Sequence, residues 1–133
     1  MRICIRGGRV VDPSQGLDGP AEIWIKGGQI EAICRAGAPV GGCQRDAQII
    51  EAKDFLIVPG LVDMHVHLRD PGYEYKETIL TGAEAAVAGG VTSVACMPNT
   101  DPPMDHGAVV EYVLRKAKEA ALAKVYPIGA ISR

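Results

Sequence analysis

DMHVHLRDPG, residues 63–72, is the stretch that decides the fold. Side chains along a β-strand point alternately to its two faces. One face should therefore carry every polar side chain of the segment: Asp63, His65, His67 and Arg69. The other face should carry apolar side chains only: Val62, Met64, Val66 and Leu68. This division is typical of a barrel strand, whose outer face packs on helices and whose carboxyl end opens into the active-site mouth.

His65 and His67 are spaced to share one metal ion. On one face of a strand their Cβ atoms should lie about 7 Å apart, which lets both rings reach an ion at about 2.1 Å. Imidazole suits zinc or a similar divalent ion. The alternative is a pair of exposed or hydrogen-bonded histidines on an edge strand. Two ligands do not complete a site, so the metal interpretation requires further ligands from elsewhere.

Arg69 and Asn99 are candidates for substrate binding. The planar guanidinium of Arg69 suits bidentate binding of a carboxylate, but the residue is equally suited to a surface ion pair with Asp70 or Glu74. Asn99 follows the next expected strand and should reach the same mouth. Taken alone, an asparagine after Pro98 reads first as a turn residue.

Strands and helices alternate after residue 59. The expected elements, in the order strand, helix, strand, helix, strand, are 61–66, 77–88, 91–97, 105–123 and 124–128. Alternation of this kind predicts a parallel sheet. Asp105 is the expected N-cap of the second helix, whose apolar face should include Val109, Val113, Leu114 and Ala117. The third histidine, His106, should be a solvated helix-terminus residue rather than a ligand.

The first 58 residues are β-like. Two similar segments, IRGGRV at 5–10 and IKGGQI at 25–30, place Gly-Gly between short β-branched runs and predict two hairpins of one small sheet. Residues 48–51 and 55–58 predict one more strand pair, and 36–46 reads as a surface loop.

The composition is that of a globular protein, with 47% hydrophobic and 23% charged residues. The net charge of −2, without a run of Lys or Arg, argues against a dedicated nucleic-acid or membrane-surface binder. The sequence has neither an apolar run of about 18 residues nor a signal-peptide layout at its start, so a cytoplasmic protein is expected.

The cysteines are not arranged as a metal or redox motif. Cys4, Cys34, Cys43 and Cys96 form no CxxC pair, which excludes a zinc knuckle of that type and a thioredoxin-type motif. Three of them stand in apolar, strand-like contexts and should be reduced, small buried side chains: Cys4, Cys34 and Cys96.

Two motifs together resemble the dihydroorotases among the cyclic amidohydrolases: PGLVDMHVHLRDPG at 59–72 and TGAEAAVAGGVTSVACMPNTDPP at 81–103. The resemblance implies a small β-sandwich over 1–58, followed by the opening strands of a (β/α)8 TIM-type barrel over 59–133. It implies one or two zinc ions, with His65 and His67 as the first two ligands, and Arg69 with Asn99 holding the free carboxylate of the substrate.

The implied reaction is the reversible cyclisation of N-carbamoyl-L-aspartate to dihydroorotate in pyrimidine synthesis. The implied partners are this small-molecule substrate and either further copies of the chain or another pyrimidine-pathway enzyme. In the family the catalytic carboxylate and remaining ligands lie on later strands, so they are expected beyond residue 133. The chain alone is therefore expected to be inactive, to bind zinc weakly and to associate through an open sheet edge.

Two other functions stay open. One is a related cyclic amidohydrolase of the hydantoinase or allantoinase type, which usually lacks the arginine and the asparagine at these places. The other is a non-catalytic, dihydroorotase-like structural partner, which has little reason to keep two ligand histidines and a carboxylate clamp.

Overall fold

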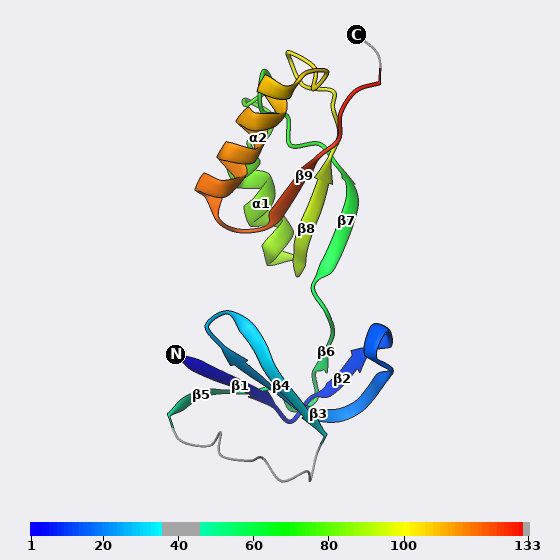
Figure 1. Ribbon diagram of the computed structural model, residues 1–133, viewed down its shortest axis with the longest axis vertical. Helices are drawn as coiled ribbons and strands as arrows, with labels where there is room; N and C mark the ends of the chain where they lie inside the picture. The colour runs from blue at the N-terminus through cyan, green and yellow to red at the C-terminus, as the bar shows by residue number, and fades with distance from the viewer. Residues whose placement is uncertain (36–45, 132–133) are drawn as a thin grey trace. The chain divides into compact units, whose positions relative to one another are not determined.

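The computed structural model describes residues 1–35 and 46–131. The chain divides at Pro59-Gly60 into two compact units, Met1–Pro59 and Gly60–Arg133 (Figure 1). The expected loop at 36–46 and Cys43 lie, except for Asp46, outside the described residues.

The first unit is a β-sheet organised around one long strand. Its elements are β1 (Arg2–Arg6), β2 (Arg9–Asp12), the short 3₁₀ helix η1 (Pro13–Gln15), β3 (Leu17–Lys26), β4 (Gln29–Arg35), β5 (Ala47–Glu51) and β6 (Leu56–Ile57). The first half of β3 pairs with β2, and its second half pairs with both β1 and β4. Because β3 takes part in both sets of pairings, one small core forms around Val10, Ala21 and Ile23.

The two Gly-Gly dipeptides have different roles. Gly27 and Gly28, with φ of 59° and 79°, close the hairpin between β3 and β4, and this prediction is confirmed. A two-residue turn of this kind needs positive φ at both positions. The hairpin predicted at Gly7-Gly8 is wrong, because β1 and β2 do not pair with each other in the described sheet. Both instead pair along successive parts of β3, so the chain continues past the glycines rather than reversing.

The strand pair predicted between 48–51 and 55–58 is also wrong. β5 lies parallel to β1, and β6 lies parallel to β2. The segment between them fits closely against Gly8, where a β-carbon would lie 2.9 Å from the Ala52 carbonyl oxygen and 3.0 Å from that of Phe55. A side chain at position 8 would therefore push the returning chain away from the sheet.

The second unit alternates strands and helices, as predicted. Its elements are β7 (Leu61–Val66), α1 (Ile79–Ala88), β8 (Val91–Cys96), α2 (Gly107–Ala120) and β9 (Lys124–Pro127). The three strands form a parallel sheet in the order β7-β8-β9 (Figure 1). Consecutive parallel strands are neighbours here, so each helix is the crossover between two adjacent strands.

Both helices pack on one face of this sheet (Figure 1). The core between them contains Leu68, Ile79, Val94, Cys96, Met104, Val109, Val113, Ala117 and Val125. In α2, Val109, Val113 and Ala117 recur every four residues and are buried as predicted, whereas Leu114 is 46% exposed and not part of the core. Burial of one such side chain contributes about 2 kcal/mol to the free energy of folding. Because Leu68 and Cys96 belong to this core, the helices hold the carboxyl ends of β7 and β8 in place.

The helix ends differ slightly from the expected ones. α1 begins at Ile79, two residues later than predicted, because Thr78 and Thr81 form a capping box. α2 has His106 rather than Asp105 at its N-cap. His106 Nδ1 lies 2.6 Å from Asp105 Oδ1, and the ring is half exposed, as expected for a residue at a helix terminus. No helix of the described residues is long and apolar enough to cross a membrane.

The described cysteines are unbonded thiols. Cys4 and Cys96 are buried, as predicted, and Cys34 is half-buried. Burial raises the pKa of the Cys4 and Cys96 thiols, which keeps them protonated and unreactive at neutral pH.

Candidate active site

The segments that follow β7 and β8 run side by side. The Met97 N–H donates to the Val66 carbonyl at 2.9 Å, and the Asp101 N–H donates to the Pro71 carbonyl at 3.1 Å. The peptide bonds Asp70–Pro71 and Asp101–Pro102 are both cis. The two hydrogen bonds join the segment that contains the loop of residues 67–72 to the loop of residues 97–102. Every candidate site residue lies on or next to these two loops.

The two candidate metal ligands are neighbours. The ring centroids of His65 and His67 lie 5.2 Å apart with an interplanar angle of 62°. Both side chains are exposed, so both rings are accessible to an ion. This is the arrangement that two imidazoles on one side of a strand end should have.

Asn99 contacts the second of these histidines. His67 Nδ1 lies 2.8 Å from Asn99 Oδ1. The amide oxygen can only accept, so Nδ1 carries the proton, and the Nε2 lone pair of a neutral His67 is then available to a metal. A metal-bound histidine usually donates its other ring N–H to a carboxylate, a backbone carbonyl or water, and Asn99 Oδ1 provides an oxygen acceptor in that position. In the described part of the chain the Nδ2 hydrogens of Asn99 have no partner, so they can donate to a ligand.

The strict alternation expected along β7 is interrupted. Asp63 pairs with Val94, a residue of the helix-facing core, and the register shifts between Asp63 and Val66. Asp63 lines a hollow together with His67 and residues of α1, and its Oδ1 accepts from the His65 N–H at 3.0 Å. The shared face of Asp63 and the two histidines therefore stays a prediction.

The apolar side of β7 is only partly covered by helices. Val66 and Leu68 pack in or against the core as expected. Val62 and Met64 are 65% and 76% exposed, so the expectation that they pack on helices is wrong in this chain. Val62 and Met64 lie at the two places where the register with β8 shifts, next to Leu61 and between Asp63 and Val66.

Arg69 presents an uncommitted guanidinium. The guanidinium makes no hydrogen bond or ion pair with any described residue, and the Arg69 side chain is half-buried. The carboxylates that were its alternative partners are engaged elsewhere: Asp70 binds Tyr112, and Glu74 Oε1 accepts from the Gly72 N–H at 2.9 Å. A surface ion pair therefore does not explain Arg69, and its five donors can serve a ligand.

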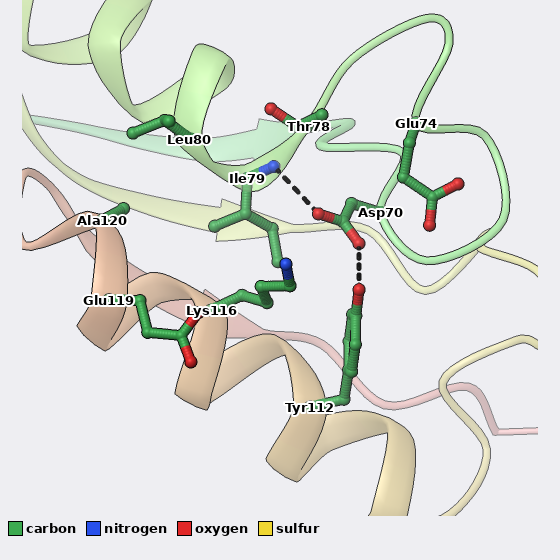
Figure 2. A pocket seen from close by; sticks show the side chains of 9 residues that line it. All are labelled: Asp70, Glu74, Thr78, Ile79, Leu80, Tyr112, Lys116, Glu119 and Ala120. Carbon is green, nitrogen blue, oxygen red and sulfur yellow. Dashed lines mark hydrogen bonds between the residues drawn. The ribbon is translucent and has the colours of Figure 1, made fainter.

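Buried Asp70 and half-buried Tyr112 form a hydrogen-bonded pair that the sequence patterns did not reveal. Asp70 is 5% exposed. Its Oδ1 accepts from the Tyr112 hydroxyl at 2.8 Å and its Oδ2 from the Ile79 N–H at 3.5 Å (Figure 2). The pair lies in a groove of about 400 Å³ between α1 and α2. The only sequence signal was an aspartate among the polar residues after β7, which does not reveal a partner on α2.

The Tyr112 hydroxyl makes stability pH-dependent. Burial, followed by the hydrogen bond to Asp70, raises the pKa of Tyr112 from 10.0 to about 12. Between these values the unfolded chain loses the proton while the folded chain keeps it, so the free energy of unfolding falls as pH rises from 10 to 12. Tyr112→Phe should show a shallower fall in the urea midpoint over this range. Parallel pH curves for the two proteins would contradict this assignment.

The described residues do not contain a complete metal site. They contain no group of three or more His, Cys, Asp or Glu side chains that is placed to hold an ion. The pair His65 and His67, with Asn99 on the Nδ1 of His67, fits zinc in donor type and in orientation. Zinc sites need three or four protein ligands, so this pair would be completed by other groups.

The model of the Dihydro-orotase-like family matches residues 54–132. This chain belongs to the dihydroorotase-like family. Relatives include the dihydroorotases of Syntrophus aciditrophicus, 52% identical over 133 residues, and of Geobacter sulfurreducens, 50% identical over 134 residues. Both alignments cover the whole chain, which spans 30% of the length of each relative.

Solved structures of other hydrolases resemble the chain in fold. The L-hydantoinase (dihydropyrimidinase) from Arthrobacter aurescens gives a TM-score of 0.77 at 25% identity, over 96% of this chain and 27% of that one. Molinate hydrolase gives a TM-score of 0.72 at 26% identity, over 97% and 30%. The dihydroorotase-like chain thus shares the mixed α/β architecture of these two hydrolases.

Proposed function

We propose that this chain provides half of the metal site and the carboxylate clamp of a dihydroorotase. The reaction is the reversible ring closure of N-carbamoyl-L-aspartate, in which the ureido nitrogen bonds to the side-chain carboxyl carbon and water is released. The observation that carries the proposal is the hydrogen bond from His67 to Asn99 beside His65. It joins a candidate metal ligand to a candidate substrate-binding residue in one cluster.

His65 and His67 are the proposed zinc ligands, for one ion or for one of two. Asn99 holds the Nδ1 proton of His67 in place, which directs Nε2 towards the ion. Zinc, when bound, supplies Lewis-acid polarisation of the amide carbonyl. No residue of this chain is assigned the role of general base.

Arg69 and Asn99 are the proposed clamp for the substrate carboxylate that does not react. The Arg69 guanidinium has no partner among the described residues, and a fork of two parallel N–H groups matches a carboxylate. The Nδ2 hydrogens of Asn99 can donate to the same group while Oδ1 serves His67. Holding this carboxylate orients the ring amide towards the metal-binding side of the site.

The fold that we propose for the complete enzyme follows from the same relationship. Residues 59–133 would supply the first strands of a (β/α)8 barrel, and residues 1–58 would belong to a small β-sandwich. The relatives are about three times as long as this chain, so their additional length is the proposed source of the remaining ligands and of the catalytic carboxylate. A cytoplasmic enzyme that acts on a small molecule, alone or with other pyrimidine enzymes, is consistent with these relatives.

The test is a hybrid enzyme, in which residues 1–133 replace the matching 30% of the Syntrophus aciditrophicus dihydroorotase. The hybrid should hydrolyse dihydroorotate and cyclise N-carbamoyl-L-aspartate, with hydantoin and allantoin as comparison substrates. Hydrolysis of hydantoin without dihydroorotate would favour the hydantoinase type, which the likeness to the Arthrobacter aurescens structure makes the relevant alternative. An inactive hybrid that still folds and binds zinc would favour the structural alternative.

A further inference from the structure

Arg69 is held in an unusual backbone conformation between two anchored residues. Its φ is 61°, in the left-handed region that residues other than glycine rarely adopt. Leu68 before it and Asp70 after it are each 5% exposed. The Arg69 carbonyl also accepts from the Tyr73 N–H at 2.9 Å. A conformation of this kind persists only where the surroundings impose it, so the anchors decide where the guanidinium points.

The anchor on the carboxyl side comes from both helices. Asp70 uses one oxygen for the Tyr112 hydroxyl on α2 and the other for the backbone N–H of Ile79, the first residue of α1 (Figure 2). Tyr112 is 42 residues from Asp70 in the sequence, so this bond joins the Arg69 loop to a distant element. Leu68 anchors the other side by packing in the helix-facing core.

We propose that Asp70 and Tyr112 are positioning residues, whose hydrogen bond sets the direction in which Arg69 presents its guanidinium to the substrate carboxylate. The inference rests on the proposed function, because it concerns the substrate that Arg69 would bind. Asp70 is buried with both oxygens engaged, so it acts through Arg69 rather than on the substrate. Tyr112 acts one step further away, through Asp70.

Kinetics of the hybrid separate positioning from simple stabilisation. Tyr112→Phe should raise KM for dihydroorotate about tenfold and change kcat less than about twofold, since a carboxylate that does not react contributes mainly to binding. In an Arg69→Met background, Tyr112→Phe should have no further effect on KM, because the residue through which it acts is gone. An equal proportional rise in KM in both backgrounds, or an effect confined to kcat, would overturn the proposal.

Hydrogen exchange of the 133-residue chain tests the anchor without using activity. Tyr112→Phe should speed exchange of the Tyr73 and Ile79 amides several-fold. Tyr75→Phe is the matched control. Tyr75 is 78% exposed, and its hydroxyl donates no hydrogen bond to the described residues. Unchanged exchange in Tyr112→Phe would also overturn the proposal. An inactive wild-type hybrid would count against the proposed function alone, because exchange would still report whether Tyr112 holds the loop.

Discussion

Replacing His65 or His67 by alanine in the hybrid enzyme should remove bound zinc and lower kcat/KM for dihydroorotate about a thousandfold or more, because the metal supplies several kcal/mol of transition-state stabilisation. The two rings lie 5.2 Å apart, close enough to bind one ion, so either substitution would leave that ion one proposed ligand short. Zinc content after gel filtration and steady-state rates measure the two effects separately.

His106→Ala is the matched control for this experiment. His106 is the only other histidine of the chain, and its ring lies at the start of α2 in contact with Asp105. Its removal should leave zinc content and kcat/KM unchanged. Full zinc content in both the His65 and His67 variants would show that the ion is held by other groups, and the proposed metal site would be wrong.

Replacing Gly72 by alanine should destabilise the second unit by about 2 to 5 kcal/mol, the sum of the costs of a left-handed backbone and of an overpacked contact. Gly72 has φ of 98°, and a β-carbon there would lie 2.6 Å from the Cβ and 2.9 Å from the Cα of Asp101. These are atoms of the adjoining loop and cannot rotate away. The loops that carry Arg69 and Asn99 would therefore have to separate, and urea unfolding followed by circular dichroism measures the cost.

Gly107→Ala is the control for the glycine experiment. Gly107 is the first residue of α2, and a β-carbon there meets nothing within 4 Å. Alanine favours a helix over glycine by up to about 1 kcal/mol, so this variant should be as stable as the wild type or slightly more stable. A Gly72→Ala protein whose urea midpoint matches that of Gly107→Ala would mean that the two loops are not packed as described.

Local patterns predicted most of the second unit. Alternating strand and helix periodicities gave the β-α-β-α-β order and the parallel sheet, which require only short-range signals. The neighbouring positions of His65 and His67 followed from their spacing on one strand. The proximity of Asn99 to His67 followed from the rule that adjacent parallel strands end in one mouth.

The errors arose where the partner of a segment is distant in the sequence. The same Gly-Gly signal closes a hairpin at 27–28 but not at 7–8, because β1 and β2 both find their partner in β3. The register shift within β7 depends on how β7 pairs with β8, which no pattern within β7 encodes. The bond from Asp70 to Tyr112 joins two segments with no common motif.

The most direct test of the proposed site is a crystal structure of the zinc-loaded hybrid with dihydroorotate, with anomalous data collected at the zinc edge. We expect zinc bound by His65 and by Nε2 of His67, and the substrate carboxylate between Arg69 and Asn99. Zinc bound away from these histidines, or a carboxylate that contacts neither Arg69 nor Asn99, would contradict the account.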